Sequence, residues 1–261
     1  MKKAKKIIAL AFAFILTVVC TVGVTIAWLQ DDDRQTNTFT VGNVAIDLIE
    51  WGRNDKGEKV AFESPDVMKK LLPVTGSAQD DTLENGVIKE VTVANTGTED
   101  AYIRVHIAIP TILDDGDPDF NAGKNILHFN YDDESVGEGK WDWSKTVDDG
   151  VYEGNWNFYN TQINNVEYNV YVVTYGSKVA SQATIAEYAM HQVYLDKNVT
   201  NEELTALDNK LGGTDASEFD GRWDIHVLAE GVQAAGFDNA YEALNSAFGV
   251  PGAEGYDPFN K

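Results

Sequence analysis

Alternation of apolar and polar residues in several separate runs restricts the fold of this chain more than any other feature. Successive side chains of an extended strand point to opposite faces, so alternation at period two is typical of a half-buried β-strand. The runs 87–93 and 101–109 alternate most clearly, and the turn Asn95-Thr96-Gly97-Thr98 lies between them. Two alternating runs around a short Asn/Gly turn predict a β-hairpin.

Further segments extend this β pattern along the chain. Residues 168–175 are β-branched and aromatic, which suits a strand in the core. The runs 185–195 and 223–232 also fit strands, although the first is compatible with a helix as well. An N-terminal strand is predicted from apolar residues that point one way on both sides of Gly42-Asn43, namely Phe39, Val41, Val44, Ile46 and Leu48.

Two short helices are expected among these strands. Thr200 followed by Glu203 is a capping-box signature, and Gly212-Gly213 marks a stop. Asp238 is the expected cap of a second helix, which Gly249 and Pro251 end. Many strands with few helices predict a mainly β fold, an antiparallel β-sandwich.

The N-terminus has the organisation of a secretory signal peptide. Four lysines between Lys2 and Lys6 precede an uncharged apolar run that ends near Leu29. A small residue at Ala27 makes cleavage between Ala27 and Trp28 plausible. We therefore expect a signal helix at 1–27, a single domain at 28–261, and contact with the membrane only through an uncleaved signal.

Other interpretations of short N-terminal and internal motifs stay open. The apolar run is long enough to serve as an uncleaved membrane anchor, since about 20 apolar residues span a bilayer. Cys20 suggests a lipoprotein, although Val19 stands where lipid modification needs a small residue. Leu72-Pro73-Val74-Thr75-Gly76 matches the LPxTG sortase signal, but neither an apolar span nor a basic tail follows it, so we interpret it as a chance match.

The charge balance excludes one class of partner. Residues 1–27 contain four of the 20 basic residues and none of the 42 acidic ones, so residues 28–261 carry a formal net charge of −26. Nucleic acids and anionic lipid surfaces repel such a chain, because binding them requires clustered Lys and Arg. The only cysteine belongs to the signal, so the exported chain has no disulfide, and a domain of this size can bury enough surface without one.

No catalytic residue or cofactor is predicted. None of the histidines, at positions 106, 128, 191 and 226, belongs to an HExxH motif, and neither a GxSxG elbow nor a phosphate-binding glycine loop occurs. We expect His106 and His226, which lie in strand patterns, to be surface or hydrogen-bonded core residues. Calcium remains a weak alternative at an acidic loop, since Ca²⁺ takes carboxylate oxygens, and its candidate ligands are Asp114, Asp115, Asp117 and Asp119.

The stretch 141–159 is rich in aromatic residues. Exposed, its tryptophans could stack on sugars; buried, Trp141 with Trp143, and Trp156 with Phe158, would share strand faces in the core. We favour burial and keep a carbohydrate-binding jelly roll as an alternative function.

The segment TIAWLQDDDRQTNTFTVGNVAIDLIE resembles the start of exported proteins of the TasA/camelysin family. The similarity consists of an Ala-aromatic junction, a short acidic stretch and the strand 37–44. Two later segments, VTVANTGTEDAYIRVHI and AEGVQAAGFDNAYEALNSAFG, are similar to other elements of the family, whereas residues 110–165 match none of them.

The resemblance implies a jelly-roll-like sandwich of two sheets, secreted by a Gram-positive bacterium into its biofilm matrix after cleavage by a SipW-type signal peptidase. It also implies assembly of the chain with itself into fibres, in which the N-terminal strand of one copy completes a sheet of the next. The donor residues would be the five apolar residues from Phe39 to Leu48 named above, unless that strand pairs within its own domain. A camelysin-like metal-dependent peptidase is the enzymatic alternative, although the chain lacks a zinc motif.

Overall fold

The structure is a computed structural model that describes residues 43–67, 71–74, 86–114, 126–130, 139–143, 145–147, 150–151, 158–210 and 224–260. All of these belong to one compact unit, Gly42–Lys261. The expected signal peptide lies outside the described residues, as does the expected cleavage point Ala27–Trp28. Within the described ranges, no helix is both long and apolar enough to cross a membrane.

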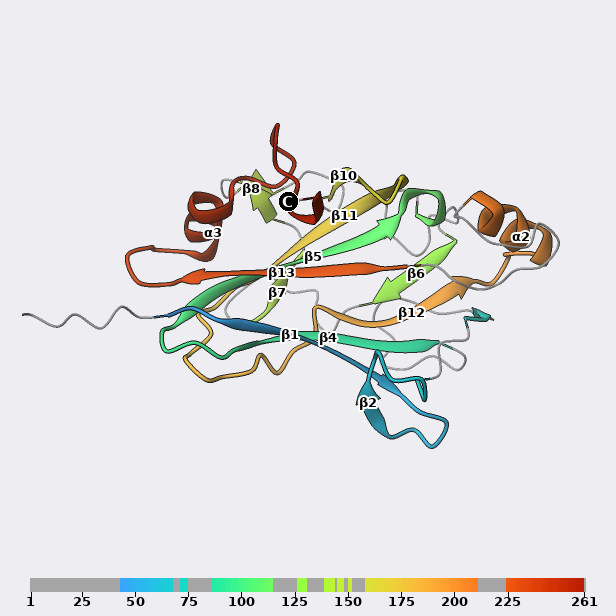
Figure 1. The fold of residues 1–261 in the computed structure, drawn as a ribbon, viewed down its shortest axis with the longest axis horizontal. Coiled ribbons are helices and arrows are strands. Elements are labelled where there is room, and N and C mark those ends of the chain that lie inside the picture. Colours follow the sequence, from blue (N-terminus) through green and yellow to red (C-terminus); the bar gives the residue numbers. More distant parts are fainter. Residues whose placement is uncertain are drawn as a thin grey trace, which may run out of the picture. The chain divides into compact units, whose positions relative to one another are not determined.

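The described fold is mainly β, as the alternation predicts, and consists of two antiparallel sheets (Figure 1). Sheet A has the order β2-β1-β4-β12-β3, with β6 paired to β12, and its one parallel pair is β12 with β3. Its strands are β1 (Ile46–Arg53), β2 (Lys59–Ala61), β3 (Pro73–Val74), β4 (Val87–Asn95), β6 (Leu127–Asn130) and β12 (Met190–Asp196).

Sheet B has the order β10-β11-β5-β13, with the short β7 paired to β11. Its strands are β5 (Ala101–Pro110), β7 (Trp141–Asp142), β10 (Phe158–Ile163), β11 (Val166–Tyr175) and β13 (His226–Gln233). A separate two-stranded ribbon pairs β8 (Lys145–Val147) with β9 (Gly150–Val151). The strands expected at 168–175, 185–195 and 223–232 correspond to β11, β12 and β13.

The main core fills the space between the two sheets. Alternate residues of β4 and β5 supply its centre, among them Val91, Val93, Ile103 and Ile107, which are fully buried. Partly buried residues of β1 and β13 close it at one side. The core therefore follows directly from the period-two pattern, because each of these strands presents one apolar face inward.

The predicted hairpin between 87–93 and 101–109 is wrong. β4 pairs with β1 and β12 in sheet A, whereas β5 pairs with β11 and β13 in sheet B, so the turn carries the chain across the sandwich. The Asn95 amide donates to the carbonyls of Glu99 (2.8 Å) and Val179 (3.0 Å), which secures this crossing. A turn signal shows where a strand ends, but not which strand becomes its neighbour.

Both expected helices are present. α2 (Asn201–Lys210) begins with the predicted capping box, in which Glu203 N donates to Thr200 Oγ1 (3.2 Å) and Thr200 N to Glu203 Oε2 (2.8 Å). α3 (Ala240–Phe248) is capped by Asn239, not by Asp238 as predicted, because the Asn239 side chain accepts from Glu242 N. Gly249, at φ 95°, ends α3 as expected.

A third layer covers the outer face of sheet B. It consists of α3 and of residues 249–260, here called the C-terminal segment, which ends in the 3₁₀ helix η2 (Pro258–Asn260). Ala243 and Leu244 of α3 pack on Tyr102 of β5, and Phe259 packs in a second small cluster near β10 and β11. The other 3₁₀ helix, η1 (Thr111–Leu113), follows β5 directly.

Candidate functional site: the groove between two sheet edges

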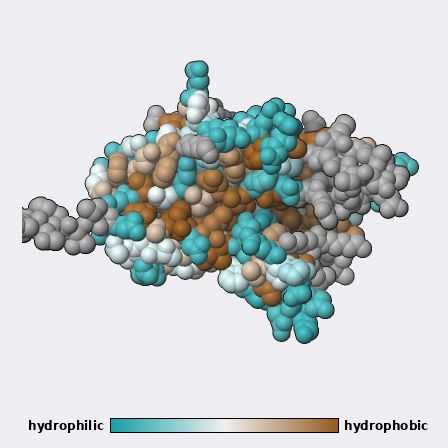
Figure 2. Space-filling view, in the orientation of Figure 1, coloured by the Kyte–Doolittle hydropathy of each residue, from teal (hydrophilic) through white to brown (hydrophobic). Residues whose placement is uncertain are grey.

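The edge groove is an open cavity of about 710 Å³ where an edge of sheet A faces an edge of sheet B. Figure 2 shows hydrophobic side chains gathered across the middle of this face of the molecule, flanked by hydrophilic ones. The groove is lined by Asp47, Leu48, Ile49, Glu50, Trp51, Ala61, Phe62, Glu63, Ile225, His226, Val227, Leu228 and Phe259.

One wall of the edge groove is the unpaired edge of β13. Within the part of the chain that the structure describes, β13 pairs with β5 alone, through eight consecutive residues. An edge strand presents free backbone N–H and C=O groups that can pair with an added strand. The β13 edge is therefore a template for main-chain hydrogen bonds beside an apolar surface.

The opposite wall is β1, and its free edge is shorter. β2 pairs with β1 from Trp51 to Arg53, and Phe62 N donates to Glu50 O (2.9 Å). On the other side, β4 pairs with β1 from Ile46 to Trp51. The part of β1 that borders the groove without a partner on this side is thus residues 46–49.

The two walls meet at one end and separate toward the other (Figure 1). A Cβ added to Gly231 of β13 would lie only 2.7 Å from Cγ2 of Ile46, so a glycine is needed for this close approach of β1. From this narrow end, the groove widens between residues 47–51 of β1 and 225–228 of β13. β1 and β13 run in opposite directions along it.

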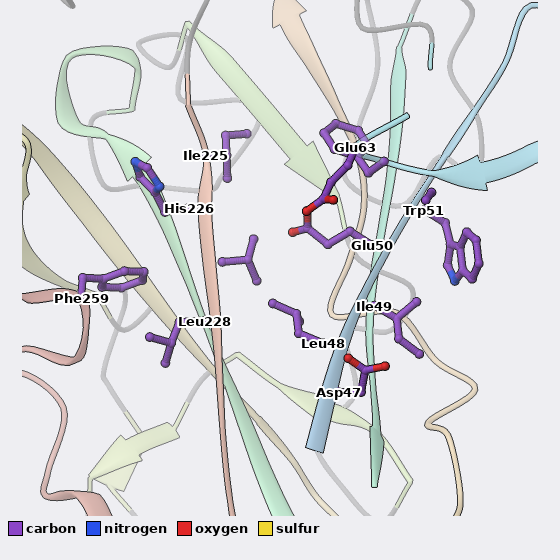
Figure 3. A pocket seen from close by; sticks show the side chains of 13 residues that line it. Asp47, Leu48, Ile49, Glu50, Trp51, Glu63, Ile225, His226, Leu228 and Phe259 are labelled. Atoms are coloured by element: carbon purple, nitrogen blue, oxygen red, sulfur yellow. The ribbon is translucent and has the colours of Figure 1, made fainter. Parts of the chain in front are cut away.

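The wide end of the edge groove is acidic. Leu48 and Glu50 point toward the groove from β1 (Figure 3), and Glu63 also lines it. Glu50 forms an ion pair with the buried Lys89 (2.9 Å), whose ammonium lies over the Phe62 ring at 4.0 Å. Lys89 thus shares the inward face of β4 with Val87, Val91 and Val93, as the alternation predicts.

The histidines at positions 106 and 226 are both engaged in side-chain contacts. His226 lies at the groove, 3.2 Å from the hydroxyl of Tyr168 and edge-on to its ring. His106 is fully buried beneath the C-terminal segment, with Nε2 3.1 Å from Glu230 Oε2 and 3.0 Å from the Tyr256 hydroxyl. This confirms the prediction for His106, which is a hydrogen-bonded core residue.

A buried polar network behind β13 fixes the C-terminal segment to sheet B. Arg104 donates to Glu230 Oε2 (2.6 Å), to Asn245 Oδ1 (2.9 Å), to Gly249 O (3.0 Å) and to the Tyr256 hydroxyl (3.1 Å). Burial alone would raise the pKa of Glu230, but the hydrogen bond from His106 and the charge of Arg104 outweigh it and lower that pKa to about 2. Glu230 is therefore a carboxylate whose role is to bind three elements together.

This network is the largest feature that the sequence did not reveal. Arg104 and His106 appear in the sequence only as polar positions opposite the apolar face of a strand, which usually indicates a solvent-exposed face. The only available signal was Glu230, a charged residue within an apolar strand. If such a charge is buried it needs a partner of opposite sign, so Glu230 points to a cation nearby without saying which one. Nothing in the sequence places 104, 230 and 256 side by side.

Three of the five predicted donor residues are described by the structure. Ile46 and Leu48 belong to β1, where they pair with Asn95 and Val93 of β4 and pack against the core. Val44 is partly buried against the same core, and Phe39 and Val41 lie outside the described residues. The strand from Ile46 onward thus pairs within its own domain, which was the alternative to donation.

Of the calcium candidates, only Asp114 is described. It is buried, and its Oδ2 accepts hydrogen bonds from the Tyr171 hydroxyl (2.5 Å) and the Asn169 amide (3.3 Å). The other three candidates, Asp115, Asp117 and Asp119, lie outside the described residues. Among the residues that were searched, no three His, Cys, Asp or Glu side chains are placed to hold a metal ion.

The two described tryptophans of the aromatic stretch are buried, at 1% and 3% exposure for Trp141 and Trp143. Trp143 stacks on Phe129 with ring centroids 5.4 Å apart, and Trp141 donates to Glu187 O (3.1 Å). This confirms the expected burial of Trp141 and Trp143, and neither residue offers a face to a sugar. Trp156 lies outside the described residues, and the side chain of Phe158 is not described. In the LPxTG match, Pro73 and Val74 form β3 of sheet A.

Comparisons with protein-family models, with curated proteins and with solved structures found no match.

Proposed function

We propose that this chain is an exported structural protein of the extracellular matrix that assembles with itself by strand donation. In this proposal, residues 28–42, here called the N-terminal segment, leave one copy and occupy the edge groove of the next. Repetition of this contact from copy to copy produces a fibre, because donor and acceptor surfaces differ and the chain of contacts does not close.

The observation that carries the proposal is the unpaired edge of β13 beside an apolar groove. A strand added there gains main-chain hydrogen bonds to β13, and its alternate side chains contact residues such as Leu48 and Val227. Monomeric proteins usually cover or blunt such an edge, since it otherwise promotes association. An edge that is left open next to apolar side chains supports a role in assembly.

The sequence of the N-terminal segment suits this groove, and the segment precedes β1 in the chain. It contains Phe39 and Val41, which share one face of an extended strand. The backbone of residues 43–45 is bonded to the turn after β4, through Thr96 N to Ala45 O (2.8 Å) and Thr98 N to Asn43 O (2.8 Å). The described chain therefore begins near the narrow end of the groove, and β1 itself stays in its own sheet.

Export through the N-terminal signal is part of the same proposal. Cleavage between Ala27 and Trp28 by a SipW-type signal peptidase would free the N-terminal segment for donation outside a Gram-positive cell. The acidic composition of residues 28–261 makes separate copies repel each other. Assembly therefore requires a specific contact at the groove and not nonspecific association.

The test compares protein that begins at Trp28 with protein that begins at Asn43. We expect the longer form to give fibres in electron microscopy and the shorter form to remain monomeric in size-exclusion chromatography. The shorter protein begins at Asn43 and not after Leu48, because Ile46–Leu48 are part of β1 and pair with β4. Their removal could unfold the domain, and loss of fibres would then not report on strand donation. Equal thermal unfolding of both forms is the folding control.

A groove variant keeps the test specific. Leu228→Lys in the longer protein places a charge at the apolar lining and should prevent fibre growth while leaving the monomer folded. Glu167→Lys, at an exposed position of β11 outside the groove, is the matched control and should still polymerise. Equal polymerisation of the Trp28 and Asn43 forms would refute strand donation.

A further inference from the structure

The edge groove has two sides, because β13 divides its lining. Neighbouring residues of a strand point to opposite faces of a sheet. Ile225 and Val227 pack against the main core between the two sheets. His226 and Leu228 point the other way, to the outer face of sheet B (Figure 3). A strand added to the edge of β13 therefore presents one row of side chains to the core and a second row to the outer face.

The C-terminal segment supplies a wall on the outer side of the groove. Directly opposite residues of paired strands share a face, so the row His226, Ala108, Val170 and Tyr159 crosses the outer face from β13 to β10. Phe259 of η2 packs on the small cluster that contains Ala108 and Val170, and it also lines the groove. Figure 3 shows Phe259 on the same side of β13 as His226. Its ring is thus an apolar surface beside the open edge.

Several contacts fix the position of Phe259. Its backbone N–H donates to Asp257 Oδ1 (3.2 Å), and its ring meets the buried His106 ring edge-on, with centroids 6.5 Å apart. Asp257 Oδ2 accepts from Thr161 Oγ1 (2.9 Å) and from Asn260 Nδ2 (2.7 Å), which ties η2 to β10. A ring that is already held in place loses little freedom when a strand packs on it, and this favours binding.

The N-terminal segment has two faces that match the two sides of the groove. Phe39 and Val41 share one face of an extended strand. The opposite face carries Thr36, Thr38 and Thr40. Threonine is β-branched, suits strands and offers a methyl group to a neighbouring ring. The apolar face suits the core side of the groove, and the threonine face suits the outer side.

We propose that Phe259 is part of the acceptor site and packs on the threonine face of the strand that another copy donates. This inference rests on the proposed function and assigns the two faces of the donated strand, with Phe39 and Val41 toward the core. The assignment is the same whether that strand runs parallel or antiparallel to β13. The C-terminal segment then has a second role, because it covers sheet B and also helps to bind the N-terminal segment of the next copy.

Substitution of Phe259 in the protein that begins at Trp28 tests the contact. Phe259→Ala should raise the critical concentration for fibre growth by about tenfold, because it truncates an aromatic anchor of the acceptor site. Phe259→Leu keeps an apolar side chain and should retain most of the growth. Val166→Ala is the matched control, since Val166 packs on the same small cluster but is not part of the groove lining, and it should polymerise normally. Urea unfolding of each variant distinguishes loss of binding from loss of the fold.

Cross-linking reports the two faces directly. The exported chain contains no cysteine, so single cysteines can be introduced in pairs. The proposal predicts disulfide-linked dimers when protein with Phe259→Cys is mixed with protein carrying Thr38→Cys or Thr40→Cys and oxidised. Phe39→Cys should instead link to Val227→Cys, on the core side of the groove.

The outcomes separate this inference from the proposal beneath it. If fibres depend on residues 28–42, but Phe259→Ala polymerises as readily as Val166→Ala, strand donation stands and the role of Phe259 is refuted. Links from Phe39→Cys to Phe259→Cys, in place of links from the threonine positions, would refute the assignment of faces. If the unchanged protein forms no fibres, the proposed function itself fails.

Discussion

The two edges of sheet B are treated in opposite ways. At the β10 edge, the C-terminal segment lies alongside: Asn260 Nδ2 donates to Gln162 O (2.9 Å), and Thr161 Oγ1 donates to Asp257 Oδ2 (2.9 Å). At the β13 edge, the described chain provides no such cover, and the neighbouring surface is the edge groove. One sheet thus has one protected and one open edge.

Among the described residues, the two edges of sheet B therefore differ in cover. A side chain that occupies a backbone carbonyl of an edge strand removes that carbonyl from pairing with another chain. The buried network around Arg104 anchors the covering segment, and its carboxylate comes from β13 itself. Four changes test how strictly the two edges differ.

The largest effect is expected from Arg104→Met. The change leaves Glu230 buried beside His106 and removes the bonds to Gly249 and Tyr256, and breaking a buried ion pair costs about 3–5 kcal/mol. Urea unfolding measures the loss. Hydrogen exchange at residues 160–163 of β10 should rise as the C-terminal segment loosens, whereas Lys197→Met, at an exposed turn, should change neither.

Acid should release the same anchor. The pKa of Glu230 is lowered from 4.5 to about 2 in the folded state, so its stabilisation is complete above pH 4.5 and is lost as the pH falls toward 2. A difference of this size is worth roughly 3 kcal/mol. Urea unfolding between pH 7 and pH 2.5 measures it.

Two variants show which carboxylate is responsible for the acid effect. Glu230→Gln should flatten the pH dependence, whereas Glu90→Gln, which changes an ion-paired carboxylate of sheet A, should leave most of it. Burial raises the pKa of Glu90, but hydrogen bonds from Lys59 and Arg53 outweigh this and lower it, so its own contribution has the same sign. An unchanged slope in Glu230→Gln would contradict the assignment.

Gly231→Val tests the narrow end of the open edge. The new side chain would meet Ile46 at 2.7 Å and should cost about 1–3 kcal/mol by forcing β1 away from β13. Adding Ile46→Ala removes the opposing atoms, so the double variant should recover part of the loss in thermal unfolding. If the destabilisation of the double variant equals the sum of those of Gly231→Val and Ile46→Ala, the close approach of the two residues does not matter for stability.

The smallest expected effect is that of Asn260→Ala at the protected edge. Loss of the bond to Gln162 O should cost about 0.5–1 kcal/mol. Light scattering should show that the variant associates with itself more strongly, because the β10 edge is less well covered. The measurement uses protein that begins at Asn43, which lacks the proposed donor segment, so that any association reports on the β10 edge. Asn198→Ala, at an exposed turn, is the control, and equal scattering by both variants would mean that Asn260 does not protect the edge.

The sequence predicts secondary-structure elements well, but it predicts poorly which strands are neighbours. The strands of the alternating runs, the capping box at Thr200 and the glycine stop of α3 all depend on residues close in sequence, and the structure confirms them. The hairpin prediction at 95–98 is wrong, because pairing of β4 and β5 depends on distant strands. The sequence also assigned Ile46 and Leu48 to a donor strand, whereas main-chain bonds to β4 hold them in their own sheet.

By itself, the sequence determined a mainly β chain with two short helices and an excess of negative charge, because periodicity, capping and composition are local or additive properties. Only the tertiary structure decided which edge of sheet B stays open, since that depends on where the C-terminal segment comes to lie against β10. The same holds for Arg104, Glu230 and Tyr256, which come together through strands and a segment up to 152 residues apart. Because these side chains are buried, each needs a polar partner within the protein, and they supply it to one another.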